Sequence, residues 1–481
     1  MTPTTRQTSW QRLRAELQPA LLAGVPEHLQ RLAWSAEQIH AAQQNGLRRL
    51  LAHAVTHAPF HRRRLAGIDV HRLEPADLSS LPVMTKADMM AALEEVLTDQ
   101  RLTRNLVEQA LAATAAEPVP ILDDYVALAT GGSSGQRGVH VFDRAALVGY
   151  ASSLARPLLA RLHALGGPPP GGLPIAMVAA VSAVHGTGLG PAFAGPGMPF
   201  QFLPVPVTLP LPQIVERLNT LQAPIVYGYS SMLARLAAEQ RAGRLHIAPL
   251  AVTAMGETLL PETRAAISEV FHAPVVDTFG STEGLVGASA PGDSVLVFNT
   301  DMCIVELVDA DNRPVPAGVP SAKVLVTNLY NLAQPLIRYE LTDAFVRQPD
   351  APDHGHLRAH VHGRADEVLH YQGVVVHPHV IRSVLVTSPQ ILDYQVRQTP
   401  HGIKVDAIAA GTADTEVPSA RLAEALAHAG LSQPEVSIRI VNDLQRHHQT
   451  GKLRRFLPLL PDNSQPDPAT GSSERQPVLQ S

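Results

Sequence analysis

The chain of 481 residues has one cysteine, few charged residues and no excess of basic ones. The lone thiol, Cys303, excludes an internal disulfide framework and any zinc site built from several thiolates of one chain, and it suits a reducing compartment. The 38 basic and 43 acidic side chains leave a net charge of −5. Proteins that bind nucleic acid usually carry a basic face, so this balance argues against that class.

Acidic and basic residues are absent from a long middle stretch, since none lies between Arg161 and Glu216. Pro and Gly interrupt this stretch, and its cleanest apolar run, 175–184, is about half of the roughly 20 residues that a membrane-spanning helix needs. We therefore expect a buried strand between loops and no membrane span. The first residues show no apolar core typical of a signal peptide, so we expect a soluble cytoplasmic protein.

Hydrophobic periodicity divides the chain into two domains and a tail. Residues 1–115 have mostly helical spacing. Beyond them, strand-like runs (IAMVAAVSAV, IVYGY, PVVDTF) alternate with helix-like runs (SSMLARLAAEQRAG, PETRAAISEVF), which predicts an α/β core with parallel strands. We predict a large α/β N-terminal domain of layered sheets and helices over 1–362, a small α+β C-terminal domain over 363–460, and a disordered tail over 461–481.

The first motif with chemical content is TGGSSGQRG, residues 130–138, after the strand-like run YVALA. Small residues allow the backbone to approach an anion, and the hydroxyl and N–H groups can bind phosphate oxygens. The motif is not a Walker loop, because no Gly-Lys-Ser/Thr closes it, and it lacks the Gly-x-Ser-x-Gly elbow of hydrolases. Alone, it fits a phosphate loop and a plain turn equally well.

The second motif is PVVDTFGSTEG, residues 274–284, in which a strand runs into Phe279 and Glu283. An aromatic ring can lie on a purine, the hydroxyl of Thr282 can bond a phosphate, and a carboxylate can hold Mg²⁺ through oxygen. A strand followed by a capped helix start explains the same letters, and this second interpretation is favoured when the motif stands alone.

Three shorter motifs follow. In PLIRYELTDAF, Asp343 stands at a strand end, where it can accept hydrogen bonds from two ribose hydroxyls or serve as an ordinary turn residue. Gly-Arg-x-Asp at 363–366 lies at the predicted domain boundary. QTGKLRRF places Lys452 in a glycine-bearing loop, although a lysine this near the end of a domain is normally solvated.

The order of these motifs resembles the adenylate-forming superfamily of acyl-CoA synthetases, luciferases and adenylation domains. The runs HAPFHRRRLAG, LPVMTKADM and MGETLLPETRAAI are most similar to its phenylacetate–CoA ligase-like branch, and the likeness spans about residues 45–457. It implies ATP-dependent, AMP-forming activation of a carboxylic acid with Mg²⁺, and then transfer of the acyl group to CoA. The alternative is an enzyme that passes the acyl group to a carrier protein or an amine.

The resemblance also implies roles for individual residues. Thr282 would bind the α-phosphate, Glu283 would hold Mg²⁺, Lys452 matches the catalytic lysine, and the small domain would turn about a hinge at Asp366. The remaining residues expected at the nucleotide and its border with the acyl group are Thr130, Ser133, Ser134, Gly135, Gly256, Glu257, Asp277, Phe279, Gly280, Ser281, Asp343 and Arg364.

This sequence departs from the family pattern at four positions. Gln136 and Arg137 stand where Lys and Pro are usual, although Arg137 can supply the positive charge. Phe279 replaces a Tyr, which keeps a ring for stacking but loses a hydroxyl, and Thr342 replaces a Gly. The altered phosphate loop keeps a non-catalytic nucleotide-binding relative as a third hypothesis, against which the retained Glu283, Asp343 and Lys452 argue.

The acyl pocket should lie along the uncharged stretch and the run IVYGYS. His185 can orient the acid or assist thiol attack, or it can be a hydrogen-bonded core histidine. Tyr227 and Tyr229 can pack an aromatic substrate, although ordinary core packing is favoured. Because the stretch carries no charge, we expect an apolar or aromatic acid.

A cluster of histidines offers ligands for zinc at alternate strand positions, but no thiolate accompanies it. We favour a solvated strand edge for these residues: His354, His356, His360 and His362.

Overall fold

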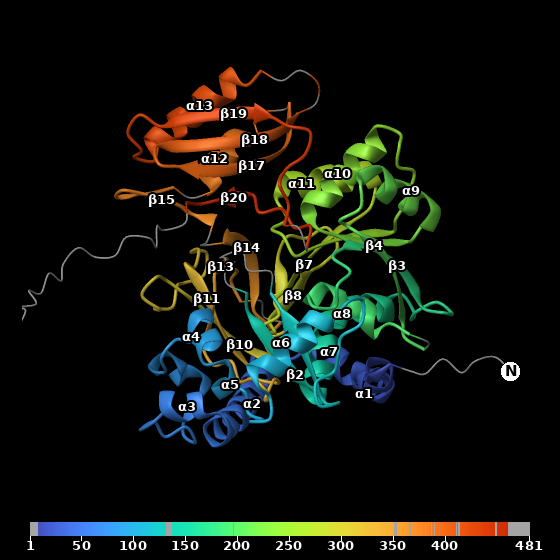
Figure 1. Cartoon of the computed structure of the whole chain (residues 1–481), viewed down its shortest axis with the longest axis vertical. Helices are drawn as coiled ribbons and strands as arrows, with labels where there is room; N and C mark the ends of the chain where they lie inside the picture. The colour runs from blue at the N-terminus through green and yellow to red at the C-terminus, as the bar shows by residue number, and fades with distance from the viewer. Residues whose placement is uncertain are drawn as a thin grey trace, which may run out of the picture. The chain divides into compact units, whose positions relative to one another are not determined.

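Figure 1 shows the computed structural model of the chain. It describes residues 8–130, 137–195, 197–350, 354–364, 367–376, 378–385, 387–388, 390–409, 411, 414–447 and 450–459. The chain divides into two units, each described by itself below: a large one, Met1–Asp366 with Asp443–Arg454, and a small one, Glu367–Asn442 with Arg455–Ser481. The domain limits drawn from the sequence stay a prediction.

The first part of the large unit is helical, as predicted. Three of its helices begin with a capping box, in which an N-cap hydroxyl and the side chain three residues on bond each other's backbone N–H groups. The Thr85–Asp88 pair at the start of α4 is one of them. The elements are α1 (Ser9–Arg31), α2 (Ala36–His57), α3 (Pro59–Arg64), the 3-10 helix η1 (Pro75–Ser80), α4 (Lys86–Ala91), α5 (Leu93–Val96) and α6 (Arg104–Ala113).

A nine-stranded sheet forms the centre of the large unit, in the order β13-β14-β9-β8-β7-β6-β5-β3-β4. Its parallel half, predicted from the alternation of strands and helices, consists of β3 (Leu173–Ala179), β4 (Phe200–Pro206), β5 (Ile225–Gly228), β6 (Ala251–Met255) and β7 (Val275–Gly280). Its antiparallel half consists of β8 (Val286–Ser289), β9 (Leu296–Phe298), β13 (Asp343–Arg347) and β14 (Arg358–Arg364).

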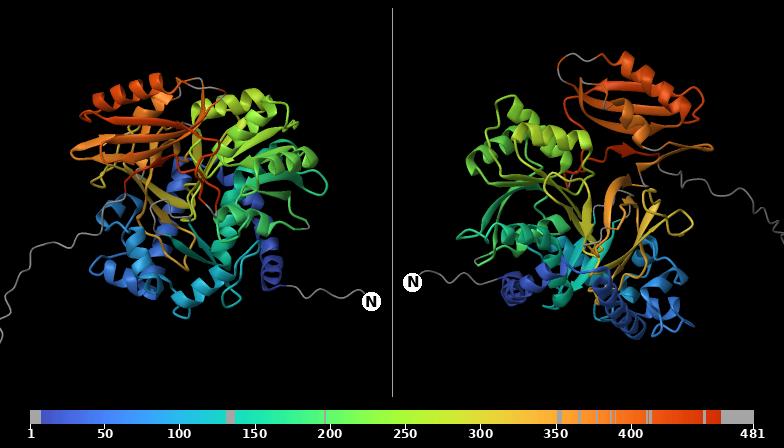
Figure 2. Two further views of the ribbon diagram at one scale, coloured as in Figure 1. Left: turned by 45° about the horizontal axis from the view of Figure 1, so that its top comes forward. Right: turned by 180° about the vertical axis from the view of Figure 1, so that it is seen from behind.

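Helices cover both faces of the parallel half because its strands are apolar on both sides. One face packs against apolar side chains of α9 (Leu211–Leu221), α10 (Ser230–Arg241) and α11 (Pro261–Phe271). Figure 2 shows these three helices together beside the strands. On the other face, Leu158 and Leu162 of α7 (Arg144–Ala164) pack against Ile175 and Ile225. The short helix α8 (Gly186–Phe193) follows β3 and lies near β4.

The register of the parallel strands aligns their carboxyl ends. Val178, Gly228, Ala254 and Asp277 form one row across β3, β5, β6 and β7. The residues that follow this row therefore leave the sheet at one edge, which is where ligands of open α/β sheets bind.

Two smaller sheets complete the large unit. One pairs β1 (Tyr125–Ala129) with β2 (Val139–Asp143), so the strand predicted at YVALA is confirmed. The other is the antiparallel sheet of β10 (Cys303–Val308), β11 (Lys323–Asn328) and β12 (Tyr339–Leu341).

The small unit is an α+β fold. It contains the hairpin of β15 (Leu369–Tyr371) and β16 (Val374–Val376), and then α12 (Pro378–Leu385). A four-stranded sheet, β19-β18-β17-β20, follows with α13 (Glu416–His428). Its strands are β17 (Ile391–Thr399), β18 (Gly402–Ala409), β19 (Glu435–Ile440) and β20 (Phe456–Leu457). The predicted fold class is confirmed, and the tail 461–481 lies outside the described residues.

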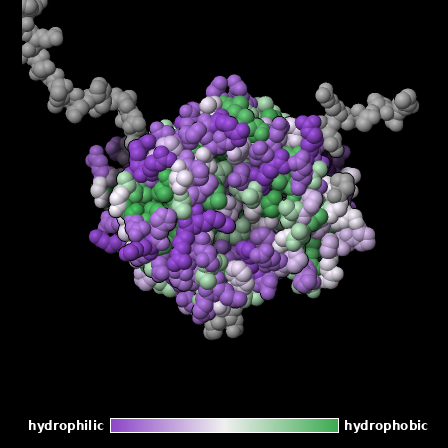
Figure 3. Space-filling view, turned by 90° about the horizontal axis from the view of Figure 1, so that it is seen from below, coloured by the Kyte–Doolittle hydropathy of each residue, from purple (hydrophilic) through white to green (hydrophobic). Residues whose placement is uncertain are grey.

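One face of the surface carries both hydrophobic and hydrophilic residues (Figure 3). On the face in Figure 3, small groups of hydrophobic residues lie between hydrophilic ones. Among the described residues, no helix combines the length and hydropathy needed to cross a membrane.

Candidate active site

One cavity of about 500 Å³ lies at the carboxyl ends of the parallel strands. The predicted site residues that line it are Thr130, His185, Tyr227, Gly256, Glu257, Asp277, Phe279, Gly280, Ser281, Thr282, Glu283, Asp343, Arg364 and Lys452. Ser133, Ser134, Gly135 and Asp366 lie outside the described residues. Tyr229 is fully buried beside this space, and its hydroxyl accepts a hydrogen bond from the backbone N–H of Ala180 at 3.2 Å.

The turn after β7 places Thr282 and Glu283 in the cavity. The chain does not begin a helix here, as one interpretation of the sequence had it, but turns into antiparallel β8. Gly284 has a φ of +109°, and a Cβ there would lie 2.2 Å from Asn328 Nδ2, so only glycine fits. Asn328 Nδ2 in turn donates to the carbonyl of Glu283 at 2.9 Å. These contacts fix the turn.

Glu283 is buried among polar groups that lack partners. Its Oε1 lies 3.7 Å from Nε2 of His140, which is 1% exposed. His140 Nε2 and Tyr339 Oη, both buried, have no hydrogen-bond partner among the described residues. Burial lowers the pKa of His140, which keeps the ring neutral. Buried polar atoms are nearly always satisfied, so this pocket suits a hydrated cation or ordered water beside the carboxylate.

Lys452 reaches the cavity from a loop held by Glu257. The two oxygens of Glu257 accept hydrogen bonds from the backbone N–H groups of Leu453 at 2.7 Å and Ser231 at 3.0 Å. Gly256 has a φ of +70°, and a Cβ there would lie 3.2 Å from Lys452 Nζ. Burial lowers the pKa of Lys452, and the nearby charge of Glu257 opposes this shift. The ammonium therefore stands in a water-poor place.

Asp343 and Arg364 face each other across β13 and β14. They are register partners, and Arg364 Nη1 lies 3.5 Å from Asp343 Oδ1. Arg364 Nη2 also donates to Thr342 Oγ1 at 2.7 Å. The threonine that departs from the family pattern thus takes part in holding the arginine.

Phe279 and the base of the phosphate-loop motif lie on the same cavity. The Phe279 ring packs edge to face on Phe345, with centroids 5.1 Å apart, which leaves another part of the ring to line the cavity. Thr130 and Gly138 close the base of the loop: the Thr130 N–H donates to the Gly138 carbonyl, and the Gly138 N–H donates to Thr130 Oγ1, both at 2.9 Å. Arg137 is instead paired with Glu108 at the surface.

Lys86 also lines the cavity, and the sequence analysis missed it. It is the first residue of α4, directly after the Thr85 cap. A compositional signal was present, because the chain has only four lysines among 38 basic side chains. Two of the four, Lys86 and Lys452, line this one cavity.

Three further predicted residues, His185, Tyr227 and Asp277, also line the cavity. His185 Nδ1 bonds the carbonyl of Ala129 at 3.1 Å, and burial lowers its pKa. Asp277 is 9% exposed, and burial raises its pKa to about 6 despite Arg264 at 3.8 Å.

The four histidines of the cluster differ in burial. No group of three or more His, Cys, Asp or Glu side chains in the described part of the chain is arranged to hold a metal ion. His354 and His362 are exposed, as expected for a strand edge, but the expectation is wrong for His356, which is 4% exposed. Its Nδ1 accepts from the Thr300 N–H at 3.3 Å, so this histidine serves packing.

Solved structures share this fold. A complex of 2-hydroxyisobutyryl-CoA ligase with 2-HIB-AMP in the postadenylation state matches with a TM-score of 0.68 and 21% identity, over 88% of this chain and 90% of that chain. The same ligase with 2-HIB-AMP and CoA in the thioesterification state matches with a TM-score of 0.57 and 20% identity, over 89% and 91%. A benzoate-CoA ligase from Burkholderia xenovorans LB400 matches with a TM-score of 0.52 and 18% identity, over 80% and 82%.

These likenesses confirm the fold that the sequence motifs indicated. No protein-family model matches the chain, and no curated protein matches its sequence. The roles of individual residues and the phenylacetate–CoA ligase-like branch stay predictions.

Proposed function

We propose that the chain is an AMP-forming carboxylate–CoA ligase of the phenylacetate–CoA ligase-like branch of the adenylate-forming superfamily. One observation carries the proposal: residues of five motifs, spread from Thr130 to Lys452, line a single cavity at the carboxyl ends of the parallel strands. The ligases of the same fold are described with 2-HIB-AMP and CoA, which supports the same chemistry here.

Each end of a bound ATP would meet a suitable group. The Phe279 ring offers a face for adenine, and the Asp343 carboxylate can accept bonds from two ribose hydroxyls. Thr282 would bond the α-phosphate. The outer phosphates would lie on the loop after Thr130, where Ser133, Ser134 and Gly135 were predicted, with Lys86 beside them. Gly256 and Arg364 would border this nucleotide.

The first reaction joins two anions. A carboxylate oxygen attacks the α-phosphorus, the bond to pyrophosphate breaks, and an acyl-adenylate forms. Negative charge grows on the phosphorus oxygens during attack. The ammonium of Lys452 offsets that charge more strongly here than in water, because burial reduces screening around it.

Glu283 would hold Mg²⁺. Mg²⁺ binds through one or two carboxylates together with substrate phosphates and retained waters, and the unpartnered atoms of His140 and Tyr339 suit such waters. When bound, the ion would neutralise phosphate charge and orient the leaving pyrophosphate.

In the second reaction the thiol of CoA would attack the acyl carbonyl, a thioester would form, and AMP would leave. The small unit would turn about Asp366 between the two reactions, and such motions can limit turnover. His185 would orient the acyl carbonyl. We further propose a cytoplasmic setting and an apolar or aromatic acid.

Acid-dependent exchange of labelled pyrophosphate into ATP tests the function. We expect exchange with at least one aryl or alkyl acid, and a thioester when CoA is added. Exchange without a thioester would favour a carrier protein or an amine as acceptor. Failure of exchange with every acid would favour a non-catalytic nucleotide-binding protein and end the proposal.

Glu283→Gln tests the magnesium role within the same assay. The Mg²⁺ concentration for half-maximal exchange should rise at least about tenfold, since loss of even an outer partner of a metal site typically costs 10–100-fold in metal affinity. Glu216→Gln on α9, an exposed position away from the cavity, is the matched control. An unchanged Mg²⁺ requirement would remove Glu283 from the metal site.

A further inference from the structure

The cavity has a second, apolar end. Away from Glu283 and Lys452 it continues between α1, α7, α8 and β4. The side chains that line this end are Leu21, Leu22, Val25, Leu154, Leu158, Leu159, Leu189, Phe193, Met198, Phe200 and Phe202. None of them is polar, so this end offers contact only to a hydrocarbon.

A second cavity of about 870 Å³ adjoins the first across a common wall. Eight residues line both: Leu22, Val25, Leu159, Ala194, Met198, Pro199, Phe200 and Phe202. The second cavity has no Asp, Glu, Lys or Arg among its described lining residues, and it extends to Gly171 and Gly172. Leu22 on its rim is 39% exposed. The two cavities therefore lie side by side, and the second reaches the surface near Leu22.

Helix α1 forms a fixed wall of this path. Its first half is joined to the end of α8 by three side chains on one face, Trp10, Arg14 and Gln18. They donate to the carbonyls of Ala192 at 3.0 Å, Ala194 at 2.9 Å and Phe193 at 3.1 Å, respectively. These carbonyls lie at the helix end, where no partner within α8 is available.

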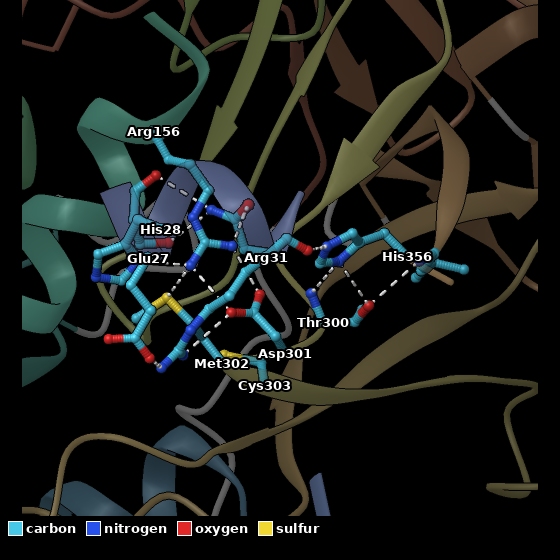
Figure 4. Close-up of polar contacts among 12 residues, drawn as sticks. Glu27, His28, Arg31, Arg156, Thr300, Asp301, Met302, Cys303 and His356 are labelled. Atoms are coloured by element: carbon cyan, nitrogen blue, oxygen red, sulfur yellow. Dashed lines mark hydrogen bonds and ion pairs between the residues drawn. The ribbon is translucent and has the colours of Figure 1, made fainter. Parts of the chain in front are cut away.

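The other end of α1 is held by a buried ion pair, shown in Figure 4. Arg156 of α7 donates to both oxygens of Asp301, at 2.7 and 3.0 Å, and neither side chain is exposed. Arg156 also donates to His28 Nδ1 at 2.7 Å. Burial beside Arg156 lowers the pKa of His28 to about 4, so the ring is neutral and can accept this bond.

We propose that the acid activated by this chain has an extended, unbranched alkyl chain that runs from the charged end past Leu22 and Val25 into the second cavity. The inference rests on the proposed function. A compact aromatic acid would fill only the first cavity and would leave the apolar path along α1 unused.

Chain length is the direct test. Burial of each methylene contributes about 0.8 kcal/mol, a factor of about fourfold. In the exchange assay, kcat/KM should rise by about that factor per carbon along the saturated series from butanoate to hexadecanoate. It should level off once the tail reaches solvent. A maximum at phenylacetate, benzoate or butanoate, with falling values for longer acids, would overturn the inference while leaving the proposed function intact.

Val25→Trp should fill the space between the two cavities, because Val25 lines both of them. We expect the ratio of kcat/KM for dodecanoate to kcat/KM for butanoate to fall by more than about tenfold, because several methylenes of the longer acid lose their place. Ala23→Trp places the same side chain on an exposed position of α1 outside both cavities and should leave the length profile unchanged. Equal loss for both acids, or no loss for dodecanoate in a variant that still activates butanoate, would contradict the proposed path.

Discussion

Arg156 and Lys452 are two cations of the large unit that are held in opposite ways. Arg156 is fully buried and donates to both oxygens of Asp301 and to His28. Lys452 lines a cavity, and no ion pair joins it to a carboxylate in the described part of the chain. A buried cation that is paired with a buried carboxylate serves stability, whereas one without an ion-pair partner that faces open space is available to a ligand.

Breaking the buried pair of Arg156 and Asp301 should have the largest effect on the free energy of unfolding. Arg156→Ala leaves Asp301 buried without its partner, and loss of one member of such a pair typically costs about 3–5 kcal/mol in the free energy of unfolding. Urea unfolding measures this loss. The double variant Arg156→Met, Asp301→Leu should recover most of it, because no lone charge remains. A loss below about 1 kcal/mol in Arg156→Ala would remove the contrast with Lys452.

Lys452→Ala should lower the rate of pyrophosphate exchange and leave the stability of the fold unchanged. Loss of one fixed donor in an active site typically lowers the rate by about 10²–10³-fold, so pyrophosphate exchange should fall by that factor. The urea midpoint should stay unchanged, since no ion pair in the described structure is broken. Thioester formation from preformed acyl-adenylate should fall far less. Equal losses in both half-reactions would place the lysine outside the adenylation step.

Asp277 tests an intermediate case, a buried carboxylate whose pKa is raised to about 6. Between the unfolded value of 3.8 and this value, the folded state binds more protons than the unfolded state. The free energy of unfolding should therefore fall as pH rises from about 4 to 6, by on the order of 1–3 kcal/mol from this group. Asp277→Asn should flatten that fall in urea titrations. If the free energy of unfolding varied with pH in the same way in both proteins, the raised pKa of Asp277 would be refuted.

The smallest effect is expected at the surface pair of Arg137 and Glu108. Both side chains are more than a third exposed, and such pairs contribute about 0–1 kcal/mol. Arg137→Ala should change the free energy of unfolding by no more than that, and a double-mutant cycle with Glu108→Ala measures the coupling. A coupling above about 2 kcal/mol would mean that this pair belongs with Arg156 rather than with ordinary surface charges.

The parallel core and the shared site were predicted from the sequence for different reasons. Strand and helix periods are local properties, so runs such as PVVDTF and PETRAAISEVF could be assigned without their neighbours. Motifs at the ends of parallel strands converge because the strands end at one edge. The resemblance to the adenylate-forming superfamily, and not this rule, predicted that Glu257 and Glu283 share one nucleotide site, and both line the cavity.

Long-range packing could not be predicted in this way. Arg156 and Asp301 are 145 positions apart, and nothing in either segment indicates the other. The burial of His356 depends on the same region, because its ring lies between Thr300 and the backbone of Arg31. Lys86 was missed because its capping box explained the segment fully, while its place beside the cavity depends on the fold of distant strands.

Helix α1 is one unbroken stretch of the chain, yet its hydrogen bonds go to the end of α8, to α7 and to the segment around Asp301. Glu283, Asp343 and Lys452 come from other elements. Under the proposed function, α1 would contribute to the choice of acid, whereas the residues proposed to bind ATP come from other elements. Replacement of α1 by a helix of different shape would then change which acids are accepted and leave Glu283, Asp343 and Lys452 in place.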